Sequence, residues 1–158
     1  MTKVAVQTNM IATLNADIDA FLSGSKQAAR ALPHMTVVMI EAHRNSIDGN
    51  PMLIDGVTYD DVKQWAVNHL AKDSAACKAH TIKVKAALFS ASKRGATLIA
   101  AIDKATKDIA LLTKSKNVAD HAEANRVKAE RDENTAIRNA AYKGIERAIF
   151  AYVYAVEN

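Results

Sequence analysis

The segment ATLIAAIDKATKDIALLTK, residues 96–114, has the most regular apolar pattern in the chain. Its apolar residues recur every three or four positions, which is the period of one face of an α-helix. Polar residues occupy most of the positions between them. The pattern therefore predicts an amphipathic helix that buries one face, formed by Leu98, Ile102, Ala105, Ile109 and Leu112.

The segment that precedes it, residues 75–91, has the same period, with Ile82, Ala86 and Phe89 on one face. Only Ser92 to Gly95 separate the two segments, and Gly95 suits the left-handed position that ends many helices. Two long helices joined by so short a loop predict an antiparallel helical hairpin over residues 75–116.

The residues that follow predict a long C-terminal helix. Residues 117–135 contain alternating acids and bases without Gly or Pro, and an apolar stripe begins at Ile137 and continues to Val156. Alternating charge on a helix is typical of a solvated surface or of a helix completed by a partner. We expect one helix from about residue 118 to 156.

The N-terminal part predicts shorter elements. Apolar spacing indicates a helix over 5–22 and a short helical turn from Ser25 that Pro33 interrupts. Residues 34–45 fit a helix or a buried strand, and the continuation of the helical period to Arg44 favours the helix.

A turn signal at residues 48–51 begins an irregular region. Residues 52–59 resemble a small β-hairpin with Asp55 and Gly56 at its turn. Thr58, followed by Asp61 three residues later, predicts the start of a helix over about 59–71.

Together these patterns predict an all-α protein, an antiparallel helical bundle with a long C-terminal helix and one small β-hairpin near residues 52–59. Composition agrees, because 158 residues include only 5 Gly, 2 Pro and 5% aromatic residues. The length suits one domain, 1–158. Its expected parts are the N-terminal helices and turn region (1–74), the basic hairpin (75–116) and the long helix (117–158).

Several function classes are disfavoured. The chain has no nucleotide-binding, hydrolase or metalloprotease motif, so we expect no enzyme and no cofactor. Cys77 and His80, with His69 one helix earlier, lack the second ligand pair that a zinc site needs, so no metal is expected. A single cysteine indicates a reducing compartment, and no signal peptide or membrane span is evident. We therefore expect a cytoplasmic protein that does not contact a membrane.

The charge distribution points to a partner. Residues 61–116 contain eleven Lys/Arg against four Asp/Glu, whereas the rest of the chain is slightly acidic and the net charge is +4. Such a local excess predicts one continuous electrostatic surface for phosphates. The candidate nucleic-acid-binding residues are Lys78, Lys83, Lys85, Lys93, Arg94, Lys104, Lys107, Lys114 and Lys116, with Lys93 and Arg94 at the tip of the expected hairpin.

These residues favour contacts to the nucleic-acid backbone, because lysine is a point charge and the candidate recognition helix carries no Asn or Gln to read bases. We expect weakly sequence-specific binding, with DNA favoured over RNA. Single strands are slightly favoured, because Tyr59, Trp65 or Tyr142 could stack on bases. The role would be that of an accessory factor in transcription, replication or genome handling.

The C-terminal stripe predicts self-association. The last part of the long helix is apolar on more than one side, which is typical of burial by a second chain. The expected oligomer interface consists of Ile145, Ile149, Tyr152, Val153 and Val156. The alternative function is a protein-interaction module or inhibitor that docks on an acidic surface of a partner protein, with the same lysines guiding association.

Overall fold

The computed structural model of the chain describes residues 3–23, 28–54, 56–70 and 81–158. Within these residues the fold is all-α with one two-stranded antiparallel sheet, as the sequence predicts. The elements are α1 (Lys3–Leu22), α2 (Ala28–Arg44), β1 (Met52–Ile54), β2 (Val57–Thr58), α3 (Tyr59–Leu70), the π-helical turn η1 (Thr81–Ala86), α5 (Ala87–Ala91), α6 (Lys93–Thr113) and α7 (Val118–Glu157).

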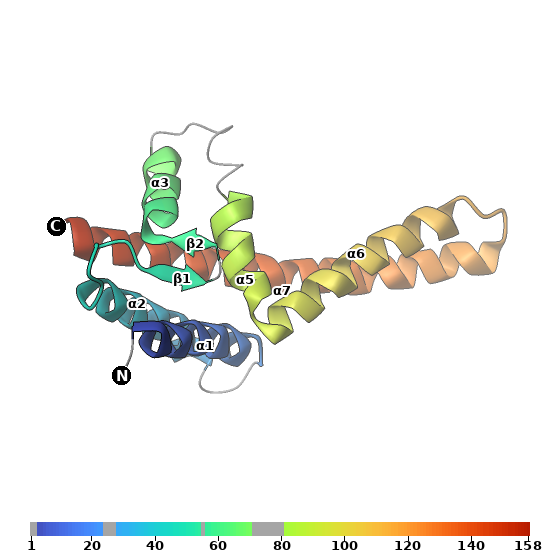
Figure 1. Cartoon of the computed structure of the whole chain (residues 1–158). Coiled ribbons are helices and arrows are strands. Elements are labelled where there is room, and N and C mark those ends of the chain that lie inside the picture. Colours follow the sequence, from blue (N-terminus) through green and yellow to red (C-terminus); the bar gives the residue numbers. More distant parts are fainter. Residues whose placement is uncertain (1–2, 24–27, 55, 71–80) are drawn as a thin grey trace.

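The molecule consists of a body and a projecting arm (Figure 1). The body contains α1, α2, the small sheet, α3, η1, α5 and the C-terminal half of α7. The arm, residues 93–138, comprises α6, the turn after it and the N-terminal half of α7, which lie side by side. Because α7 has 40 residues, it is about 60 Å long and connects the arm to the body as one helix. The predicted long C-terminal helix is thus confirmed.

The core of the body joins all of its elements. Burial of each large apolar side chain stabilises the folded state by about 1.5–3 kcal/mol, so the cluster of buried side chains in this core holds the helices together. Helix α7 passes through the cluster and packs against α2 and α3. The largest fully buried side chains include Trp65, Tyr152, Phe89, Leu14, Ile18, Met35, Met39, Leu53, Leu88, Ile145, Ile149 and Val62.

Helix α2 differs from the prediction at its start. The sequence predicts an interruption at Pro33, but α2 continues through this residue from Ala28 to Arg44. Pro33 lies in the second turn, where its missing N–H removes one backbone hydrogen bond, to the carbonyl of Ala29. Burial of Met35 and Met39 against the core outweighs this local loss. The helical interpretation of residues 34–45 is confirmed.

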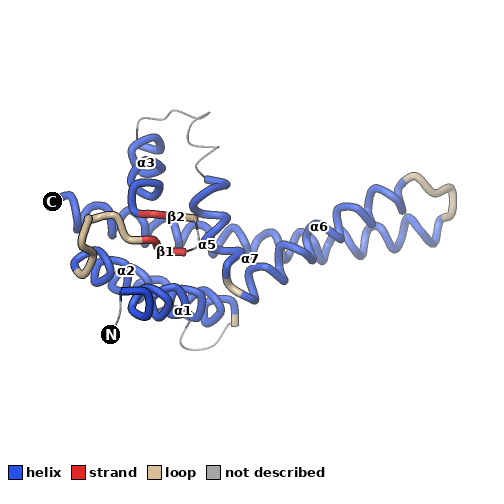
Figure 2. The backbone as a smooth tube through the Cα atoms, in the orientation of Figure 1, coloured by secondary structure: helices blue, strands red, loops and turns tan. Residues whose placement is uncertain are grey.

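The predicted hairpin at residues 52–59 is confirmed (Figure 2). Met52 pairs with Thr58, and Gly56 adopts a positive φ of 80°, which a glycine tolerates without strain. The backbone N–H and the hydroxyl of Thr58 both donate to Asp61 Oδ2, at 3.1 and 3.3 Å. This is the capping arrangement expected for the start of α3.

Within the described residues, the main partner of α6 differs from the one that the predicted hairpin over 75–116 gives it. Residues 75–80 lie outside the described residues, and the part from 81 to 91 contains only η1 and the five-residue α5. Helix α6 forms its extended pairing with α7 instead of with the segment that precedes it. The antiparallel hairpin of the molecule is therefore the arm, whose second helix is the charge-rich first half of α7.

The corner between α5 and α6 explains this difference. Ser92 is fully buried, and its Oγ accepts from the Gly95 N–H at 3.0 Å while its hydroxyl donates to the Phe89 carbonyl at 2.9 Å. Ser92 is thus the N-cap of α6, and Gly95 lies inside the first turn of that helix. The expectation that Gly95 ends a helix in the left-handed conformation is wrong.

Candidate nucleic-acid interface

Three of the candidate lysines lie on one face of α6, and Lys114, the residue that caps its C-terminal end, continues this face. Lys104, Lys107 and Lys114 follow Lys93 by 11, 14 and 21 residues, which are close to multiples of 3.6. The apolar stripe of α6, which includes the buried Ile102, packs against α7, so the four lysines point away from α7. They form a row about 32 Å long along the arm. We call these four residues the lysine row.

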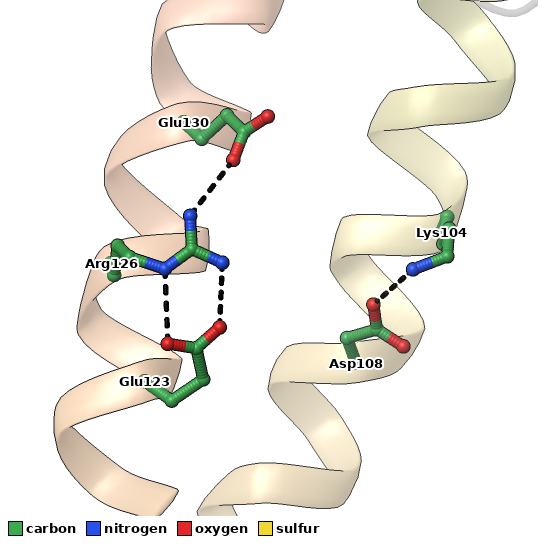
Figure 3. Close-up of polar contacts among 5 residues, drawn as sticks. All are labelled: Lys104, Asp108, Glu123, Arg126 and Glu130. Atoms are coloured by element: carbon green, nitrogen blue, oxygen red, sulfur yellow. Dashed lines mark hydrogen bonds and ion pairs between the residues drawn. The ribbon is translucent and has the colours of Figure 1, made fainter.

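The lysine row is open to solvent. All four of its side chains are exposed, and only Lys104 forms an ion pair among the described residues, to Asp108 at 3.0 Å (Figure 3). An exposed pair at this i,i+4 spacing is worth only about 0.3–0.5 kcal/mol, so a phosphate could replace the carboxylate at little cost. The row therefore presents cations that an anionic partner could contact.

Two of the cations that α7 carries in the arm, Arg126 and Arg131, are paired with acids of the same helix. Arg126 donates to Glu123 at 2.6 Å and to Glu130 at 3.4 Å, all along one helix (Figure 3). The hydrogen bond from Arg126 lowers the pKa of the Glu123 carboxyl, so both groups stay charged and paired. Arg131 pairs with the adjacent Asp132 at 3.3 Å. The arm is thus electrostatically two-sided, with its excess positive charge on α6.

The base and the tip of the arm differ from the prediction. Lys93 and Arg94 lie at the base, where the first turn of α6 meets α1, and not at a free tip. The Arg94 backbone N–H donates to Asp19 Oδ1 at 2.8 Å, so a carboxylate from α1 already occupies the positive end of the α6 dipole. Lys114 and Lys116 occupy the tip instead.

The turn at the tip is fixed by short polar contacts. The Ser115 hydroxyl donates to Asp120 at 2.6 Å, and the Asn117 N–H donates to the Ser115 hydroxyl oxygen at 3.1 Å. Asn117 caps α7 by accepting from the Ala119 N–H at 2.9 Å. The two tip lysines thus extend from an ordered turn.

Lys85 does not belong to the open surface. Its side chain is only 14% exposed and pairs with Glu146 at 3.4 Å. The ammonium also lies 5.3 Å from the ring centre of Tyr142 and 5.9 Å from that of Trp65, in cation–π geometry. Lys85 is therefore held inside the body and does not join the exposed lysines of α6. Lys78 and the side chain of Lys83 lie outside the described residues.

The proposed aromatic platforms are largely inaccessible. Trp65 and Tyr59 are buried in the core, and Tyr142 is half-buried against Phe89, with ring centres 5.2 Å apart. Arg138 and Lys85 lie 5.5 and 5.3 Å from the ring centre of Tyr142. Stacking of bases on Trp65 or Tyr59 would therefore require a change of structure, and Tyr142 is already in contact with cations of the chain.

The C-terminal stripe packs within a single chain. Ile145, Ile149 and Tyr152 are fully buried in the core, while Val153 and Val156 are half-buried beside it. The Tyr152 hydroxyl also contacts His43 Nδ1 at 3.1 Å. The body of the same chain therefore accounts for the three buried residues of the apolar stripe.

A groove of about 580 Å³ lies at the base of the arm, between α6, α7 and the end of α1. Its lining combines two cations and two uncharged polar groups with an apolar surface. No sequence pattern signals this groove, because its residues come from three helices far apart along the chain. The lining residues are Leu22, Lys93, Arg94, Thr97, Leu98, Ala101, Asn134 and Ile137.

Comparisons of the chain with protein-family models, with curated proteins and with solved structures found no match. Within residues 3–23, 28–54, 56–70 and 81–158, no group of three or more His, Cys, Asp or Glu side chains is placed to hold a metal ion. The helices in these ranges are each too short or too polar to cross a lipid bilayer.

Proposed function

We propose that this protein is a non-enzymatic nucleic-acid-binding accessory protein that contacts the phosphate backbone through the lysine row. The observation that carries the proposal is the division of charge on the arm. Exposed lysines follow one face of α6, while Arg126 and Arg131 of α7 pair with acids on their own helix. A partner that approaches α6 therefore meets an excess of positive charge, because the four lysines are opposed only by Asp103 and Asp108 on this helix.

The shape of this surface suits a nucleic-acid backbone. A straight row of about 32 Å faces an array of phosphates that carries about one charge per 1.7 Å of duplex axis. Lysine ammonium groups bind phosphates as point charges, and α6 contains no Asn or Gln that could read a base edge. Binding is therefore expected to depend weakly on sequence, in transcription, replication or genome handling in the cytoplasm.

A pair of matched double variants tests the proposal. K107Q/K114Q removes two charges from the lysine row, and K128Q/K143Q removes two charges from exposed positions of α7. Loss of two phosphate contacts is expected to weaken oligonucleotide binding about 20-fold at 0.1 M salt. The α7 variant should bind within about threefold of the parent. Equal affinities of the two variants would contradict the proposal.

One observation favours a second candidate, a module that docks on an acidic protein. Leu111 is 69% exposed and lies within the lysine row, between Lys107 and Lys114. An apolar side chain among cations fits an acidic surface with an apolar depression better than it fits a phosphate backbone. Leu111→Ser should leave oligonucleotide binding unchanged under the first proposal. A loss of binding to one stoichiometric protein on this substitution would favour the second.

Self-association through the C-terminal helix is not part of the proposal, because three of its five expected contact residues are buried in the chain's own core. One copy of the arm presents the whole lysine row by itself. We therefore expect the affinity of a short oligonucleotide to be independent of protein oligomerisation. Sedimentation of the protein with an oligonucleotide at equal concentration should give a complex of one chain and one strand.

A further inference from the structure

We propose that the groove at the base of the arm receives one unstacked nucleotide of a single strand whose backbone follows the lysine row. This inference rests on the proposed function and adds a strand preference to it. Two independent observations support it: the chemistry of the groove lining, and its continuity with the row.

The lining separates into parts that match a nucleotide. Lys93 and Arg94 are exposed on one side and could hold a phosphate, while Leu98 and the 40% exposed Ile137 provide an apolar surface for a base. Asn134 makes no side-chain hydrogen bond to any described residue. Its amide therefore has two donors and one acceptor available for the polar edge of a base.

The groove is continuous with the row, because Lys93 belongs to both. A strand that contacts Lys104 and Lys107 and then extends towards the body reaches Lys93 at the groove. The volume of the groove, about 580 Å³, lies within the usual range of small-molecule sites, about 300–1,000 Å³. Charge complementarity and position thus favour a nucleotide of the bound strand over an unrelated ligand.

Only a single strand can supply such a nucleotide at low cost. In a duplex the base edges are paired and the faces are stacked, so insertion would require a base to be flipped out at a cost of a few kcal/mol. The groove therefore selects single strands, while the lysine row alone binds single and double strands alike. This preference does not depend on the buried aromatic rings.

Two groove variants test the inference. Asn134→Ala removes the free amide, and Ala101→Phe fills the groove from an exposed position of α6. Each should weaken binding of a single-stranded 20-mer about five- to tenfold, because contacts to one base are worth about 1–3 kcal/mol. Binding of a duplex of equal length should stay within about twofold of the parent. Circular dichroism and the unfolding midpoint serve as folding controls.

Strand dependence separates this inference from the proposed function. K107Q/K114Q should weaken the binding of both the single strand and the duplex, since the lysine row binds the phosphates of each. The groove inference is overturned if the groove variants bind the single strand as the parent does, or if they lose affinity for the single strand and the duplex equally. The proposal for the lysine row stands in both cases. If the parent itself binds neither ligand, both are overturned. A 2-aminopurine within the strand should brighten on binding to the parent and not to Ala101→Phe.

Discussion

The carbonyl oxygen of Phe89 lies directly against the Cα of Gly95, so that a Cβ added to Gly95 would come within 2.0 Å of that oxygen. The close approach closes the corner at which α5 ends and α6 begins. Because the corner is fixed, it sets the direction in which α6 and the lysine row leave the body. A glycine is thus required at position 95 because there is no room for a Cβ, and not because the backbone is left-handed.

Gly95→Ala is expected to destabilise the protein by about 2 kcal/mol, since rigid backbone has to move to admit the methyl group. Gly144→Ala is the matched comparison, because its Cβ would meet the flexible end of Leu32 and not backbone. We expect the smaller loss at Gly144, where added helix propensity partly offsets the contact. Urea unfolding of both variants measures the difference, and a larger loss at Gly144 would contradict this account of the corner.

Lys85→Met should reduce stability and leave nucleic-acid binding unchanged. The substitution keeps the apolar stem but removes the ion pair to Glu146, at a cost of about 1 kcal/mol for a partly solvated pair. The double variant K85M/E146M should recover part of this loss. We expect the oligonucleotide affinity of Lys85→Met to be within about twofold of the parent. A tenfold loss of affinity would show that Lys85 takes part in binding.

The stability of the body is expected to fall as the pH drops below about 6.5. Burial lowers the pKa of His43 from its ordinary value of 6.5, although Glu157 opposes the shift. Below that value the unfolded chain takes up a proton that the folded state disfavours, so acid favours unfolding. His43→Gln should lose less stability than the parent between pH 7.5 and 5.5 in urea titrations. Parallel curves for both proteins would contradict this role of His43.

Tyr59 connects the start of α3 to the end of α7. Its hydroxyl donates to Glu157 at 2.5 Å, and burial together with this carboxylate raises the pKa of Tyr59, so the phenol remains a donor. Tyr59→Phe should cost about 0.5–1 kcal/mol by the loss of this bond. Tyr154→Phe is the control, because Tyr154 is 71% exposed. Equal unfolding midpoints of the two variants would show that the bond contributes nothing.

Local sequence patterns predicted most of the helices. The apolar period located α1, the later part of α2, α3, α6 and α7, because each buries one face against the core. Pro33 misled the prediction, since tertiary burial of the turns that follow it outweighs one missing hydrogen bond.

Pairing between helices was less predictable. The short link from Ser92 to Gly95 is compatible both with a turn between two antiparallel helices and with a capped corner. Which of the two forms depends on buried contacts of Ser92, and sequence spacing does not encode these contacts. The first half of α7 has few apolar residues, so nothing local indicated that Ala124 and Val127 would be buried against α6.

The candidate site was predicted in part. The 3.6-residue period places Lys107 and Lys114 opposite the apolar stripe, and the structure extends this face to Lys93 and Lys104. The burial of Lys85 had no signal in the sequence, because its partner Glu146 lies 61 residues away. The groove residue Asn134 had no signal, since its neighbours in space belong to other helices.

The salt dependence of oligonucleotide binding decides whether the lysine row is a phosphate-binding surface. Fluorescence anisotropy at several salt concentrations gives the slope of log affinity against log salt for a single-stranded 20-mer. Four lysine contacts predict a slope of about −3, and K104Q/K107Q/K114Q should reduce it to about −1. K128Q/K143Q should keep the slope of the parent. A slope near zero for the parent, or one that the row variant leaves unchanged, would contradict the account.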